Sequence, residues 1–205
     1  CNGKIKIDED LPNLESLDLS HIQRTSTFAL CVKLKYIHFH DTNIELSPTW
    51  TAIETFYYQN ENIKFVQIPE TWTKICRLEL HGCGIVSPPT TLTYLEIRET
   101  TGFLMAKLQL QKMTNLKTLI LYDSHNTSVT ISIPETCTAL RRLELSSCAL
   151  KELPDKLVEL RELKISQFGW CSVPATYVNL QKLILNFPLT TAAEFSLPDT
   201  LMNIR

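Results

Sequence analysis

The sequence has few glycines, no long apolar run and no large excess of charge of either sign. Its five glycines are scattered over 205 residues, which excludes a glycine-rich loop for phosphate groups. No apolar run approaches the roughly 20 residues of a membrane-spanning helix, so we expect no membrane segment. Lys and Arg number 20 against 22 Asp and Glu. We expect no nucleic-acid partner, because neutralising phosphates takes an excess of positive charge.

The cysteines are odd in number and are not clustered. They lack the paired spacing of disulfide-bonded end caps, and residues 1–12 show no secretory signal. We therefore expect reduced thiols and a cytoplasmic chain. The seven cysteines are Cys1, Cys31, Cys76, Cys83, Cys137, Cys148 and Cys171.

A repeated phrase of about 20 residues runs the whole length of the chain. The clearest copies read LRRLELSSCAL and ICRLELHGCGI, and the shared pattern is LxxLxLxxCxL. Nine copies at a spacing near 20 residues indicate a single repeat array over residues 1–205. The spacing falls to 17 residues after Ile75 and rises to 24 after Leu92 and Leu116, which predicts irregularity of the outer face between residues 85 and 135. The copies begin at Leu14, Leu34, Ile53, Ile75, Leu92, Leu116, Leu140, Leu160 and Leu180.

The pattern predicts one short strand in each unit. Its last two apolar positions are two residues apart, so on a strand both point into a core while the residue between them points outward. One unit cannot bury its apolar face alone, and stacked units form a parallel sheet over a continuous core. Prolines between the copies, as in PETWTKI and PDKLVEL, disfavour long helices in the return segments. The predicted inward residues include Leu17, Leu19, Leu78, Leu80, Leu143, Leu145, Leu183 and Leu185.

These units resemble those of the leucine-rich-repeat superfamily over residues 4–204. The short form with proline resembles the bacterial and protozoan type and the repeats of plant immune receptors. The resemblance implies an α/β solenoid with a horseshoe shape, a parallel β-sheet on the concave face, and irregular or 3-10 returns on the convex face. It also implies an inward Asn or Cys at the ninth position, bonded to the backbone of the neighbouring turn. Cys83 and Cys148 match that position, with polar substitutes at Thr42, Glu61, Thr100 and Ser124 and breaks at Ile22, Phe168 and Pro188.

Both ends of the array are incomplete, and neither carries a recognisable capping sequence. Residues 4–13 resemble a return segment that lacks its strand. Leu201 fits either the start of a tenth repeat or the large residue three positions before such a start. Open ends expose core and unpaired strand edges, so we expect a longer protein, a covering partner or self-association there.

Tyr, His and Arg gather at the outward positions of units two to six, with Glu beside them. This composition is typical of protein-binding surfaces, although a solvated sheet face is also rich in Tyr. The glutamates are expected to meet basic residues of the partner. The predicted partner-binding residues are Tyr36, His38, Tyr57, Arg77, Glu79, Tyr94, Glu96 and Arg98.

Catalysis, metal binding and a cofactor are not expected. His38, His40 and His81 occupy outward positions, but no local motif unites them into a set of metal ligands. Cys83 and Cys148 are predicted to be buried, which raises the pKa of a thiol and makes it a poor nucleophile. Outward carboxylates such as Glu79 and Glu96 are expected to be neighbours on adjacent strands, but nothing in the sequence predicts a pocket that would exclude water from them.

Two classes of binding function remain open, beside a purely structural spacer that binds no ligand on the concave face. The preferred one is a non-catalytic cytoplasmic module, a scaffold or regulatory domain that binds a protein or peptide on the concave face. The alternative is the ligand-sensing domain of an immune-type or cell-surface receptor. Within either class, a rival contact surface is the outer face or the chain ends, where Trp50 and Trp72 would contribute.

Overall fold

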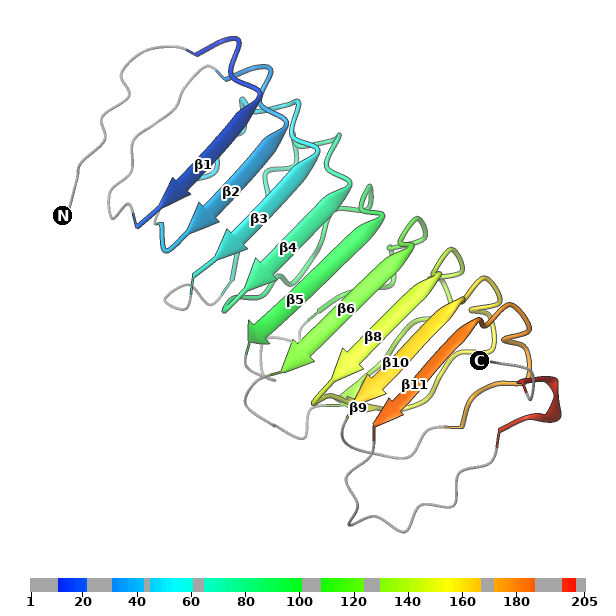
Figure 1. The fold of residues 1–205 in the computed structure, drawn as a ribbon. Helices are drawn as coiled ribbons and strands as arrows, with labels where there is room; N and C mark the ends of the chain where they lie inside the picture. Colours follow the sequence, from blue (N-terminus) through cyan, green and yellow to red (C-terminus); the bar gives the residue numbers. More distant parts are fainter. Residues whose placement is uncertain are drawn as a thin grey trace.

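The described residues form a solenoid whose strands stack side by side in a single row (Figure 1). The computed structural model describes residues 11–21, 31–42, 45–60, 65–100, 108–123, 130–166, 172–186 and 197–201. The main sheet consists of β1 (Ser16–Ser20), β2 (Tyr36–His40), β3 (Thr55–Gln59), β4 (Arg77–His81), β5 (Tyr94–Thr100), β6 (Thr118–Asp123), β8 (Arg142–Ser146), β10 (Glu162–Ser166) and β11 (Lys182–Asn186). All neighbouring pairs are parallel, and their order follows the chain.

The return segments contain turns and little regular structure. A second sheet pairs only β7 (Thr130–Ile131) with β9 (Ala149–Leu150). A 3-10 helix, η1, covers Asp199–Leu201, and the described ranges contain no α-helix. None of the described helices is long and apolar enough to cross a membrane. The predicted repeat solenoid is confirmed, and its returns are as poor in helix as the prolines indicated.

The register of the main sheet follows the repeat position by position. Leu17 pairs with Ile37, which pairs with Phe56, and the next inward partner is Leu78. The predicted inward leucines of β1, β4 and β8 are buried. Leu183 and Leu185 are only half-buried, because β11 is the last described strand and has a neighbour on one side.

One irregularity interrupts the sheet, between β5 and β6. Ile97 pairs with Leu121, but the next pair joins Thr100 to Asp123, so β5 contains an extra residue. The irregularity predicted from the uneven repeat spacing for residues 85–135 concerns the outer face, whereas this bulge lies in the sheet itself. Residues 101–107 and 124–129 of that region lie outside the described ranges.

A second apolar layer comes from the turns that precede each strand. Trp72 and Tyr177 are buried, and their backbone amides donate to the carbonyls of Pro69 and Pro174, 3.0 and 3.2 Å away. Trp50 and Trp72 stack with ring centroids 6.1 Å apart inside the core. The prediction that these two tryptophans offer an outer contact surface is therefore wrong, because the proline turns aim both rings inward.

The same turn decides the position of Leu201. Its amide donates to the carbonyl of Pro198 over 2.9 Å, and its side chain is buried. Leu201 thus occupies the place that Tyr177 has one unit earlier, the large residue before a repeat start. Residues 1–10 and 202–205 lie outside the described ranges, so self-association through the ends stays a prediction.

The inward ninth position is buried wherever its side chain is described, at Thr42, Cys83 and Cys148. The Thr42 hydroxyl makes no hydrogen bond among the described residues. Its backbone carbonyl instead accepts from Asn60 Nδ2 at 2.8 Å. The bond to neighbouring backbone that was expected from a ninth-position side chain is thus made by Asn60, the eighth residue of unit three. The ninth positions Glu61, Ser124, Ile22, Phe168 and Pro188 lie outside the described residues, as does the side chain of Thr100.

Candidate protein-binding surface

The side of the main sheet that points away from the core, here called the front face, is built from three rows of side chains. The rows are the third, fifth and seventh positions of each unit, such as Ser16, Asp18 and Ser20 in β1. Strand pairing places Asp18 beside His38 and His38 beside Tyr57. All eight predicted partner-binding residues lie in these rows, as the repeat spacing indicated.

A chain of contacts crosses the front face from β1 to β4. His38 Nδ1 lies 3.1 Å from Asp18 Oδ2, and the His38 ring meets the Tyr57 ring edge-on with centroids 4.3 Å apart. The Tyr57 hydroxyl donates to Gln59 Oε1 at 3.0 Å and lies 3.3 Å from His81 Nδ1. Each side chain in this series of contacts therefore restricts the conformation of the next one.

Glu96 continues the chain into β5 and receives several donors. Tyr94 donates through its hydroxyl and Arg98 through Nε, while His81 Nε2 lies 3.7 Å from Glu96 Oε1. The His81 ring, followed by the Tyr94 and Arg98 donors, lowers the pKa of Glu96 to about 2 against the opposing effect of burial. The carboxylate is therefore ionised at neutral pH even though it is buried.

Arg77 joins β4 to β5 on the same face. Its guanidinium carbon lies 3.7 Å from the centroid of the Tyr94 ring, a cation–π contact. Arg77 Nε also donates to Glu79 Oε1 at 2.6 Å. Arg77 is thus held in a fixed position while part of its side chain remains exposed.

These contacts join seven of the eight predicted residues in one network, and Tyr36 is the exception. Tyr36 is one of the exposed large side chains, with 48% of its surface accessible. Glu79 and Glu96 were expected to be available to basic residues of a partner, but each already accepts a hydrogen bond from an arginine of its own strand. Their side chains are 19% and 8% exposed.

Three members of this network, Asp18, Gln59 and His81, were not among the predicted partner-binding residues. Asp18 pairs with His38, while Gln59 and His81 hold the Tyr57 hydroxyl. All three occupy outward positions of the repeat. Their positions in the rows, next to His38 and Tyr57 on the same or the neighbouring strand, are the signal that points to them.

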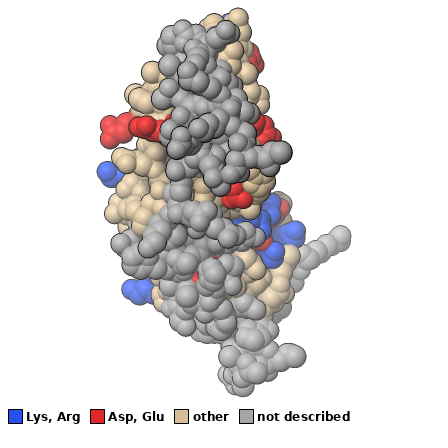
Figure 2. Space-filling model, turned by 90° about the vertical axis from the view of Figure 1, so that its left-hand side faces the viewer, with Lys and Arg blue, Asp and Glu red and all other residues tan. Residues whose placement is uncertain are grey.

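The front face changes character beyond β5. Ile120 sits between Glu96 and Glu144 in the middle row and is buried. Glu144 accepts from Lys164 Nζ at 2.6 Å and Arg142 Nη2 at 3.1 Å. Burial opposes ionisation of Glu144, but these two donors outweigh it and lower its pKa. Figure 2 turns the molecule by 90° and shows another side, on which Lys and Arg and Asp and Glu of the described residues lie in small separate groups.

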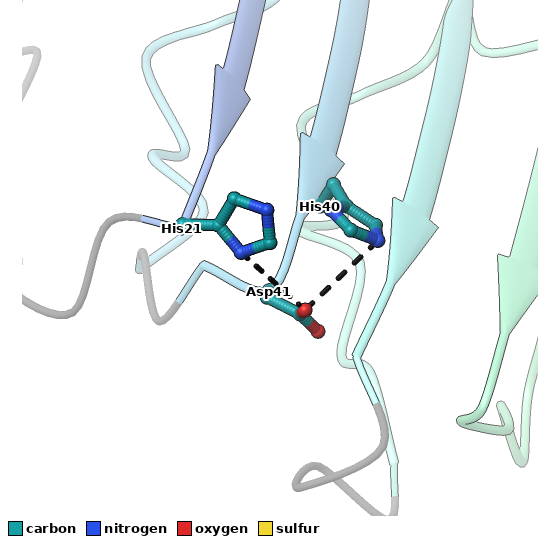
Figure 3. Close-up of side chains that lie close together, drawn as sticks. All are labelled: His21, His40 and Asp41. Carbon is teal, nitrogen blue, oxygen red and sulfur yellow. Dashed lines mark ion pairs between the residues drawn. The ribbon is translucent and has the colours of Figure 1, made fainter.

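The structure does not unite His38, His40 and His81, the histidines weighed as metal ligands from the sequence. Instead His40 lies at the end of β2 with His21 and Asp41 (Figure 3). Asp41 Oδ2 is 3.6 Å from His21 Nδ1 and 3.9 Å from His40 Nε2. His81 belongs to a different group, with Glu79 and Glu96.

Solved structures of known proteins share this architecture. An internalin from Listeria monocytogenes superposes with a TM-score of 0.58 over 93% of this chain, at 14% sequence identity. A plant peptide hormone receptor, RGFR1 in complex with RGF2, gives a TM-score of 0.50 over 85% of the chain, at 15% identity. Both are leucine-rich-repeat proteins. The chain has the leucine-rich-repeat fold. It spans 64% of the internalin chain and 36% of the receptor chain.

A sequence relative covers most of this leucine-rich-repeat array. The protein SUPPRESSOR OF npr1-1, CONSTITUTIVE 1 of Arabidopsis thaliana is 26% identical over 198 residues, or 90% of this chain. The chain spans only 12% of the length of that protein. No protein-family model matches the sequence.

The two cysteines at the inward ninth position of the leucine-rich repeats, Cys83 and Cys148, are buried thiols. Burial raises the pKa of both Cys83 and Cys148 to about 12, as the sequence analysis predicted in direction. Cys148 Sγ donates to the carbonyl of Ser146 at 3.2 Å, within its own turn. Five of the seven cysteines are described, and all five are present as thiols.

Proposed function

We propose that this leucine-rich-repeat array is a non-catalytic module that binds a protein or peptide on the front face of β1 to β5. The observation that carries the proposal is the connected network of Tyr, His, Arg and Glu side chains described above. Tyr and Arg dominate the residues that contribute most binding energy in protein interfaces. Here they are already held in position, which reduces the entropy lost on binding.

The receptor structure with the same fold supports a partner of this kind. It is described as a plant peptide hormone receptor and was solved in complex with RGF2. In the present chain, the exposed surfaces of Tyr36, Arg77 and Arg98 would make the direct contacts. Of the two glutamates predicted to meet basic residues, Glu79 is the more exposed and would be approached first.

The electrostatic state of the network supports binding without catalysis. A general acid or base works best with a pKa near the operating pH. Glu96, the most buried carboxylate of the network, has its pKa lowered to about 2 and stays ionised. Cys83 and Cys148 are raised to about 12, so few of these thiols become thiolate nucleophiles at neutral pH.

Cellular location separates the two functional classes, and we propose the cytoplasm. The five described thiols support it, because secreted repeat proteins commonly carry disulfides. The receptor alternative predicts disulfides once the full-length protein is made in its own cell. Thiol titration of that protein under denaturing conditions distinguishes them: if all of its cysteines, including the seven of this chain, titrate as reactive thiols, the cytoplasm is favoured, and a shortfall favours export.

A triple variant, Tyr57→Ala, Arg77→Ala and Tyr94→Ala, tests the binding surface. Peptides selected from a random library against the unaltered chain serve as probes. We expect the variant to keep the circular dichroism spectrum, because these side chains lie outside the core. Affinity should fall at least roughly thirtyfold, as it does when interface residues of this kind are truncated.

The matched control is Glu162→Ala with Lys182→Ala, two front-face changes in β10 and β11 at a half-buried and an exposed position. It should bind the selected peptides like the unaltered chain. If the folded triple variant binds them with unchanged affinity, or only the control loses binding, the front face of β1 to β5 is not the site.

A further inference from the structure

The group at the carboxyl ends of β1 and β2 has the chemistry of a transition-metal site. It offers two imidazole nitrogens, from His21 and His40, and one carboxylate oxygen, from Asp41. Imidazole suits zinc and its neighbours, whereas calcium and magnesium prefer a shell of oxygens. We propose that His21, His40 and Asp41 bind one divalent transition-metal ion of the zinc class, with at least one coordination position open to solvent.

The distances suit such an ion after a small adjustment. Bonds of about 2.0–2.2 Å at tetrahedral angles put neighbouring ligand atoms about 3.4 Å apart. Asp41 Oδ2 lies 3.6 Å from His21 Nδ1 and 3.9 Å from His40 Nε2. All three residues can place a ligand atom within 4.8 Å of the others. Figure 3 shows the carboxylate oxygen facing both rings.

The repeat backbone fixes where the three side chains begin. His21 and Asp41 hold the eighth position of successive units, and both adopt left-handed φ angles, 57° and 48°. The His21 amide donates to the His40 carbonyl at 2.8 Å, and the Asp41 amide donates to the Gln59 carbonyl at 2.9 Å. Stacking of the two units therefore brings the ligands together without a local sequence motif.

Solvent can reach this group, so an ion can enter and the side chains can adjust. The exposed fractions are 69% for His21, 32% for His40 and 43% for Asp41. Among the described residues, salt-bridge contacts to Asp41 come from these two histidines and from no Lys or Arg. A metal ion would therefore meet little competition from fixed positive charge.

The second group with suitable ligands, Glu79, His81 and Glu96, lacks this advantage. Arg77 pairs with Glu79, and Arg98 pairs with Glu96. The negative charge of each carboxylate is therefore already balanced by an arginine, and a cation would have to displace both arginines. The metal site is also separate from the peptide-binding surface, because neither His21 nor Asp41 belongs to the contact network of β1 to β5.

Zinc titration of the chelator-treated chain, followed by calorimetry, tests the site. We expect one zinc per chain and a rise in Tm on zinc addition, because binding to the folded state stabilises it. Three variants should each weaken binding roughly tenfold or more: Asp41→Asn, His21→Asn and His40→Phe. Asn tolerates left-handed φ, and Phe keeps a ring at His40, so circular dichroism should show intact folds.

Two variants serve as controls. His38→Ala changes an exposed histidine of the same strand that pairs with Asp18 and belongs to neither ligand group. His81→Ala removes the imidazole of the second group. Both should bind zinc like the unaltered chain. The proposal is overturned if zinc does not bind with a Kd below roughly 100 µM. It is also overturned by binding that survives the three ligand variants or is lost only in His81→Ala.

Discussion

Arg98 donates from Nε to the carboxylate of Glu96, two residues earlier on the same strand. The two side chains lie on the front face, yet Glu96 is buried beneath its neighbours. Tyr94 donates to the other carboxylate oxygen, Oε2, and His81 Nε2 lies 3.7 Å from Oε1, the oxygen that accepts from Arg98. Glu96 therefore occupies an outward position of the repeat but is a buried, ionised group, and its ionisation contributes to the stability of the fold.

Acid should destabilise the protein through Glu96. Its folded-state pKa of about 2 lies below the ordinary value of 4.5, so folding favours the ionised form. The stabilisation is complete above about pH 4.5 and is lost as the pH falls toward 2. It amounts to roughly 2–4 kcal/mol. Urea unfolding of Glu96→Gln should show a weaker pH dependence in this window than the unaltered chain.

Glu135→Gln is the control for this effect. Glu135 pairs with Lys156 at 2.6 Å, but its side chain is 62% exposed, and such surface pairs contribute little. Its pH dependence should match that of the unaltered chain. An identical loss of pH dependence in both variants would show that the buried position of Glu96 is unimportant.

Asn60→Ala should destabilise the third unit. The variant loses the 2.8 Å bond from Asn60 Nδ2 to the Thr42 carbonyl, inside the core. We expect a cost of about 1–2 kcal/mol in chemical unfolding. Asn179→Ala removes a similar bond, to the Val158 carbonyl at 2.9 Å, from an exposed side chain and should cost less. Equal costs would contradict the role of burial.

Trp72→Ala should be among the most damaging core changes. The indole is buried, stacks on Trp50, meets Phe56 edge-on at 5.5 Å and donates to the Ser47 carbonyl at 3.0 Å. Truncation should lower the free energy of unfolding by about 3–5 kcal/mol. Val178→Ala, at a side chain that is 67% exposed, should change it by less than about 0.5 kcal/mol. A mild Trp72 variant would place that ring outside the core.

Cys148 should tolerate a small polar substitute better than a larger apolar one. Cys148→Ser keeps a donor for the Ser146 carbonyl and should be mild. Cys148→Leu overpacks the turn and loses that bond, at about 1–3 kcal/mol in thermal or chemical unfolding. The native Cys148 thiol should also react slowly with a thiol reagent at pH 7, because burial raises its pKa to about 12. Reaction as fast as that of a small-molecule thiol would refute its burial.

Much of the architecture followed from the repeat. Two apolar residues spaced two apart fix which side of a strand is buried, and a constant unit length fixes which residues become neighbours in the sheet. Leu78 therefore lies beside Phe56, and Arg77 beside Tyr94, as the alignment of units predicted. The proline turns also indicated returns without long helices.

The sequence by itself determined the strands, their order and the rows of the front face, because these depend only on periodicity. Tertiary structure decided the rest, because side-chain contacts depend on the size and charge of neighbours about 20 residues away and on the turn between them. It placed Trp50 inside the core, selected Asn60 to bond the Thr42 carbonyl, and buried Glu96. It also brought His21 to Asp41, since left-handed turns in successive units stack only once the solenoid has formed.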